Sequence, residues 1–159
     1  MLRKLAAVLA ALLALVGCDA RMSDLKPGVS TASDVSAVMG KHTFEWKEPD
    51  GAVTWEFPRG PAGVVTYMIV IGPDGKLREI RQVLTDANFA TLKPGMTGDE
   101  VRRVVGRPAE TMKFANLGED VWSWRYEPAT GEQWMYHVHF NLADGKLKRT
   151  SRTQANTPP

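Results

Sequence analysis

The stretch LKPGMTGDEVRRVVG, residues 92–106, decides the fold, because the chain contains a second copy of it. Residues 25–40 read LKPGVSTASDVSAVMG, the same pattern with one additional residue after Val29. Each copy places Leu-Lys-Pro-Gly before a short segment with helical periodicity and a glycine after it. The repeat predicts two similar domains in tandem.

The sequence of the second copy predicts a short, firmly delimited helix. Thr97 and Glu100 have the spacing of a capping box, in which the hydroxyl and the carboxylate each bond the other residue's backbone N–H. Apolar residues follow at i, i+3 and i+4, which places them on one face of a helix. Gly106 ends the helix, and Gly98 at its start is expected to be merely tolerated. The first copy repeats these features at Thr31, Asp34, Val35, Val38, Met39 and Gly40.

Segments with strand patterning follow each helix, separated by turn sequences such as Pro-Asp-Gly. In the first repeat they are residues 43–47, 52–57, 64–71 and 76–84. In the second repeat, a short helix at 87–92 capped by Asp86 comes first, and the strands are 110–114, 121–126, 133–141 and 146–151. Trp55 aligns with Trp124, and Phe57 aligns with Tyr126.

The expected fold class is α+β. Each repeat, residues 24–85 and residues 86–153, is predicted to be a helix–helix–four-strand unit. Units of this size bury thin cores, so we expect the two to share one eight-stranded antiparallel sheet with the short helices on one face. Residues 154–159 are expected to form a flexible tail.

The N-terminus predicts export and lipid attachment. Residues 1–17 have the form of a signal peptide, with Arg3 and Lys4 before an apolar run that is too short to span a bilayer. The run ends in Leu-Val-Gly-Cys, which resembles a bacterial lipobox and implies acylation, including palmitate, at Cys18. Residues 18–23 would then be a short tether. The alternative is a secretory signal followed by an incidental buried cysteine.

Charge gives no indication of a nucleic-acid partner. The chain has 20 basic and 18 acidic residues, and removal of Arg3 and Lys4 leaves 18 of each. A near-neutral mature chain has no basic footprint of the kind that binds phosphate backbones.

The motifs of the second repeat resemble those of the SmpA/OmlA family of BamE-like lipoproteins. They are Gly95-Met96-Thr97, Val101, Gly106-Arg107-Pro108, Trp124-Arg125-Tyr126, Phe140 and Asp144-Gly145. The first repeat carries a degenerate version, with Gly28-Val29-Ser30, Val35, Gly40-Lys41-His42 and Trp55-Glu56-Phe57. The resemblance implies an envelope lipoprotein that binds proteins, although the best-known members have a single domain. Two such units in tandem resemble the beta-lactamase inhibitor protein, which binds its partner on a concave sheet face.

The resemblance implies an outer-membrane location facing the periplasm. Asp19 leaves the inner membrane open as an alternative, because in enteric bacteria an aspartate at this position favours retention there.

Five residues are candidates for partner binding. Met135, His137 and His139 alternate with an apolar set on one strand, so we expect them on the open face of the sheet. Trp122 aligns with Val53, so the repeat does not require its bulk, and Tyr67 is the first-repeat counterpart of His137. The alternatives are core packing for the aromatic residues and zinc binding by the two histidines, for which no third ligand has suggestive spacing.

The sequence indicates no catalytic chemistry and no cofactor. It offers no Ser/His/Asp pattern, and residues 95–98 lack the lysine of a phosphate-binding loop and have no second glycine at the spacing that such a loop needs. The lipobox and the family resemblance therefore predict a membrane-anchored, periplasm-facing, non-catalytic protein-binding module in outer-membrane or envelope assembly, with an envelope protein as partner. The alternative is a protein inhibitor of an envelope or secreted hydrolase.

Overall fold

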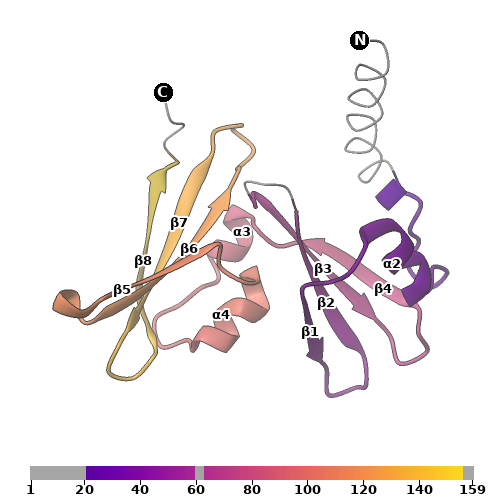
Figure 1. Ribbon diagram of the computed structural model, residues 1–159, viewed down its shortest axis with the longest axis horizontal. Coiled ribbons are helices and arrows are strands. Elements are labelled where there is room, and N and C mark those ends of the chain that lie inside the picture. Colours follow the sequence, from indigo (N-terminus) through magenta and orange to yellow (C-terminus); the bar gives the residue numbers. More distant parts are fainter. Residues whose placement is uncertain (1–20, 60–62, 156–159) are drawn as a thin grey trace, which may run out of the picture. The chain divides into compact units, whose positions relative to one another are not determined.

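The computed structural model describes residues 21–59 and 63–155. The predicted signal peptide and Cys18 lie outside the described residues, as do residues 156–159 of the tail. The chain divides into two compact units, one containing the segments up to Phe57 and Ile69–Ile80, and the other containing Pro58–Met68 and the chain from Arg81 onward. The predicted α+β class is confirmed (Figure 1), while the repeat boundary at residues 85 and 86 stays a prediction.

The first repeat has a four-stranded sheet and, in its described residues 24–59 and 63–85, one helix where two were predicted. The sheet has the order β1-β2-β3-β4, in which neighbours along the chain are neighbours in space. The elements are α2 (Ala32–Met39), β1 (Phe44–Lys47), β2 (Val53–Arg59), β3 (Val65–Ile71) and β4 (Leu77–Gln82).

The second repeat has two helices and an antiparallel sheet of order β5-β6-β7-β8. Its elements are α3 (Asp86–Phe89), α4 (Gly98–Val105), β5 (Glu110–Phe114), the 3-10 turn η1 (Ala115–Leu117), β6 (Glu119–Tyr126), β7 (Trp134–Asn141) and β8 (Leu147–Gln154).

Both predicted capping boxes form. In α4, the backbone N of Thr97 lies 2.7 Å from Oε2 of Glu100, and the N of Glu100 lies 3.3 Å from the hydroxyl of Thr97. In α2, Thr31 and Asp34 make the same reciprocal bonds. Each box satisfies backbone donors that the first turn of a helix leaves without an intrahelical acceptor.

Helix α3 differs from the prediction in its start and its length. Thr85, and not Asp86, is its N-cap, and the Thr85 hydroxyl accepts from the backbone N of Asn88 at 3.2 Å. The carboxylate of Asp86 instead accepts a hydrogen bond from the hydroxyl of Tyr126, at 2.9 Å. The helix ends at Phe89, a single turn.

The expectation of one eight-stranded sheet is wrong, because the strands pair into two sheets of four. Within each sheet, short turns bring consecutive strands together. Between Gln82 and Glu110 the chain forms α3 and α4 instead of a hairpin. A tight turn would force the next strand to pair with β4, but a connection of this length does not.

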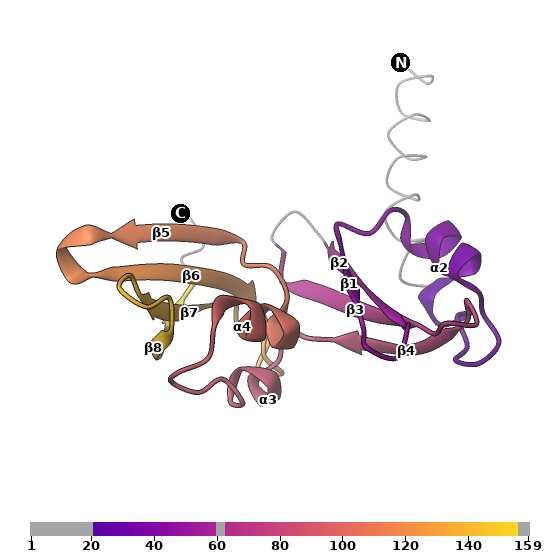
Figure 2. The same ribbon diagram turned by 90° about the horizontal axis from the view of Figure 1, so that it is seen from below.

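The core of the second repeat lies on the face of the sheet that α3 and α4 cover (Figure 2). Trp124 is 1% exposed, and its indole N–H donates to the carbonyl of Gly106 at 3.1 Å, just past the end of α4. Phe89 of α3 stacks on Tyr136 with ring centroids 4.1 Å apart. The single-turn α3 is thus held by aromatic packing and not by helix propensity.

In residues 21–59 and 63–155, no helix is long and apolar enough to cross a membrane.

Candidate functional site

The register of the second sheet assigns its side chains to two faces. Trp122, Trp124 and Tyr126 of β6 point toward the helices, so the alternate residues occupy the opposite face, which we name the polar face. The polar face consists of Glu110, Met112, Phe114, Glu119, Val121, Ser123, Arg125, Met135, His137, His139, Arg149, Ser151 and Thr153.

Glu119 is the centre of a charged cluster on this face. Its residue exposure is only 3%, yet three cationic or ionisable groups reach its carboxylate. Nη2 of Arg149 lies at 2.9 Å, Nδ1 of His139 at 2.8 Å and Nζ of Lys148 at 3.2 Å. These bonds, that of Arg149 first and that of His139 second, hold the pKa of Glu119 at about 2, below its ordinary 4.5.

His139 also connects this cluster to Ser151. Nε2 of His139 lies 2.9 Å from the hydroxyl of Ser151, so Ser151, His139 and Glu119 have the spacing of a hydrolase triad. Sequence reading missed this arrangement because the three residues come from three different strands. Arg149 and Lys148 already compensate the negative charge of Glu119, which leaves little of it to stabilise an imidazolium. The arrangement therefore fits a structural network better than a general base.

His137 occupies a second hydroxyl network. Its Nδ1 lies 2.8 Å from the hydroxyl of Ser123, and its Nε2 lies 3.0 Å from the hydroxyl of Thr153. Burial lowers the pKa of His137, and the charge of His139 lowers it further. All four ring nitrogens of His137 and His139 thus have oxygen partners. In the described parts of the chain, no group of three His, Cys, Asp or Glu side chains is placed to hold a metal ion.

The structure brings together only part of the predicted partner-binding set. Met135, His137 and His139 share the polar face. Met135 and His137 are half-buried, and His139 is buried. Trp122 lies on the opposite face, where its ring packs 4.7 Å from that of Phe140. Tyr67 is half-buried in β3 of the first sheet.

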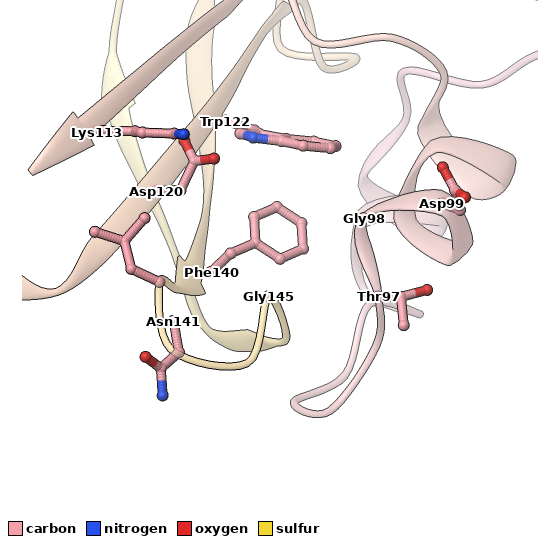
Figure 3. Close-up of a pocket in the computed structure, with 10 residues that line it drawn as sticks. Thr97, Gly98, Asp99, Lys113, Asp120, Trp122, Phe140, Asn141 and Gly145 are labelled. Carbon is pink, nitrogen blue, oxygen red and sulfur yellow. The ribbon is translucent and has the colours of Figure 1, made fainter.

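A cavity of about 430 Å³ lies beside Trp122, between the start of α4 and strands β5 to β7 (Figure 3). We name it the α4 cavity. It is lined by Thr97, Gly98, Asp99, Lys113, Asp120, Trp122, Phe140, Asn141, Leu142 and Gly145.

Gly98 has a steric role that the sequence analysis did not predict. A Cβ atom at this position would lie 2.7 Å from Cη2 of the Trp122 ring, well inside contact distance. The glycine therefore makes room for the indole. A comparison of the two repeats could have indicated this role. The first repeat has Ala32 at the position of Gly98 and the smaller Val53 at the position of Trp122.

One family model matches the second repeat. Residues 82–150 match the family model of the outer membrane protein assembly factor BamE domain. The match begins at the end of β4 and extends into β8, so it covers α3, α4 and the second sheet. This repeat has a BamE-like fold, as its motifs indicated. No curated protein sequence matches the chain significantly.

Three solved structures match the chain with low TM-scores. A candidate osmotically inducible lipoprotein OsmE is 24% identical over 42% of this chain and 75% of its own, with a TM-score of 0.38. The DUF4309 family protein YjgB of Bacillus subtilis is 16% identical, covering 83% and 82%, with a TM-score of 0.32. A candidate beta-lactamase inhibitor protein from Streptococcus mutans is 9% identical, covering 78% and 82%, with a TM-score of 0.31. At these TM-scores none of the three supports an assignment of function.

Proposed function

We propose that this protein is a lipid-anchored, periplasm-facing lipoprotein that serves as a non-catalytic protein-binding module in outer-membrane assembly. The observation that carries the proposal is the BamE-domain match over residues 82–150, which coincides with a complete helix-and-sheet unit. The lipobox-like sequence ending at Cys18 supports the anchor, which would hold the chain at the outer membrane.

The polar face is our candidate for the partner surface. The helices cover the other face of the same sheet, while Met135, His137 and His139 lie beside polar neighbours that are already bonded to one another. A surface whose side chains are fixed before binding loses little conformational entropy when a partner docks. Trp122 and Tyr67 lie elsewhere and would belong to separate contacts.

The test is cross-linking of the full-length acylated protein in membranes, followed by purification and mass spectrometry. We expect enrichment of barrel proteins and of their assembly machinery. Met135→Asp, which places a charge on the polar face, is expected to reduce that enrichment, whereas Glu79→Gln on β4 serves as a control that leaves the second sheet untouched.

Two outcomes contradict the proposal. Enrichment of a single soluble hydrolase, with inhibition of its activity by the purified chain, favours the inhibitor function instead. Recovery of a Cys18→Ser variant in the membrane fraction at the wild-type level contradicts the anchor. Fractionation of inner and outer membranes, with Asp19→Ser as comparison, decides between the two membranes.

A further inference from the structure

We propose that the α4 cavity receives an arginine side chain of a protein partner, with the guanidinium bound by Asp120 and stacked on Trp122. The inference rests on the proposed protein-binding function and adds the chemistry of one contact. It concerns the helix-covered face and is therefore separate from the polar face.

A buried carboxylate oxygen marks the position of the ligand's donor. Oδ1 of Asp120 is buried and has no hydrogen-bond partner among the residues that the structure describes. A buried charged acceptor without a donor is costly, so native structures rarely leave one unsatisfied. Asp120 lines the α4 cavity. A rotation of its carboxylate would bring the buried oxygen to the cavity, where an entering donor can satisfy it.

Aromatic side chains form the wall next to this carboxylate. Trp122 and Phe140 lie with ring centroids 4.7 Å apart, and Figure 3 shows the Trp122 ring extending toward the start of α4. In the first repeat, Val53 and Val70 stand at the corresponding positions, so the fold does not require aromatic residues there. An indole face beside a carboxylate suits a guanidinium, which stacks on aromatic rings and donates to carboxylates in one plane.

An anion is the competing occupant, because a helix N-terminus and Lys113 also line the cavity. The first turn of α4 is already capped, since the Glu100 carboxylate bonds the backbone N of Thr97 and the Thr97 hydroxyl accepts from the N of Glu100. Asp99 follows in the same turn and adds negative charge. Together with Asp120, these carboxylates make the cavity unfavourable for an anion.

Lys113 would then be a competitor of the incoming cation. It lies directly opposite Asp120 in the β5–β6 register, and its side chain is exposed. An exposed lysine pays conformational entropy to hold a pairing geometry, and such surface pairs contribute little. Removing the lysine should therefore favour the arginine.

The experiment uses the full chain in detergent micelles and follows amide and indole signals by NMR. The probe is N-acetyl-arginine methylamide. The matched controls are the citrulline analogue, which is nearly isosteric and neutral, the lysine analogue, and inorganic phosphate. We expect saturable shifts at Gly98 and at the Trp122 indole with arginine, binding at least about tenfold weaker for citrulline, and weaker binding for lysine.

Variants test the role of each charge. Asp120→Asn should weaken arginine binding by about tenfold or more, and Lys113→Met should leave it unchanged or tighten it. Equal binding of citrulline or lysine, shifts with phosphate alone, or full binding by Asp120→Asn would overturn the proposal. If Asp120→Asn does not fold, Lys113→Met decides, because loss of arginine binding in that variant contradicts the assigned charges.

Cross-linking separates this proposal from the proposed function. If the wild-type chain captures envelope proteins while the arginine probe fails to bind, the α4 cavity proposal falls and the module function stands. If the probe binds and no envelope protein is captured, the module function falls.

Discussion

Nδ1 of His139 lies 2.8 Å from Oε2 of Glu119, and the same oxygen lies 2.9 Å from Nη2 of Arg149. Glu119 belongs to β6, whereas Arg149 belongs to β8, which is not adjacent to β6 in the sheet. One nearly buried carboxylate therefore connects three strands on the polar face. The pH dependence of stability should report on this connection.

Glu119 is expected to make the protein acid-sensitive. Its pKa is about 2 in the folded chain, below the ordinary 4.5, so the folded state binds the proton more weakly than the unfolded state. The stabilisation is therefore present above about pH 4.5 and is lost as the pH falls toward 2. We expect Glu119→Gln to be less stable near pH 7 and to lose less stability on acidification, as measured by urea unfolding at several pH values.

The matched control for this measurement is Glu132→Gln, because Glu132 is an exposed carboxylate in the connection between β6 and β7. It should keep the acid dependence of the wild type. An acid dependence that is the same in Glu119→Gln and in the wild type would contradict the assignment.

His137 is expected to affect stability nearer neutral pH. Burial lowers its pKa, and the neighbouring His139 lowers it further, against a smaller opposing effect of Glu110. The folded chain thus disfavours the protonated ring, so stability is retained above the unfolded pKa of about 6.5 and falls as the pH drops below it. His137→Gln should flatten this part of the stability curve. An unchanged curve between pH 8 and pH 5.5 would show that His137 is not its source.

Local sequence signals predicted the local structure of this protein well. Thr97 with Glu100, and Thr31 with Asp34, identify the starts of α4 and α2 because a capping box depends only on residues three apart. Alternation in β6 and β7 separated Trp124 and Val138 from His137 correctly, since side chains of a strand alternate between faces.

Relationships between distant segments were predicted less well. Nothing in the sequence near Glu119 indicates that Arg149 and Ser151 will lie beside it, because their proximity depends on the register of three strands. The division into two sheets was missed for a similar reason, since it depends on which strand edges meet. Placing Trp122 at a cavity required knowing that α4 lies over it.

The capping boxes are expected to stabilise both repeats by similar amounts. Thr97→Ala and Thr31→Ala each remove a hydroxyl that accepts a backbone N–H of the first turn, and each should cost about 1 kcal/mol of unfolding free energy. Ser36→Ala, which removes an exposed hydroxyl in the interior of α2, is the control and should be neutral or slightly stabilising. A cost for Ser36→Ala equal to that of Thr31→Ala would show that capping is not the cause.

The contact between Gly98 and Trp122 predicts a strong coupling between two substitutions. Alanine is normally preferred to glycine in a helix, yet a Cβ at residue 98 would lie 2.7 Å from the indole ring. Gly98→Ala should therefore destabilise the protein by about 1–3 kcal/mol through overpacking. In a Trp122→Leu background the same substitution should be neutral or stabilising, because the ring that it meets is gone.

Urea unfolding of the wild type, the two single variants and the double variant measures this coupling as a double-mutant cycle. The first repeat supplies the control, because Ala32 and Val53 stand where the second repeat has Gly98 and Trp122. Ala32→Gly should simply lose helix propensity, at a cost of about 0.5–1 kcal/mol, with no dependence on Val53. Additive effects of Gly98→Ala and Trp122→Leu would show that the indole tolerates a side chain at residue 98, and the glycine would then have no packing role.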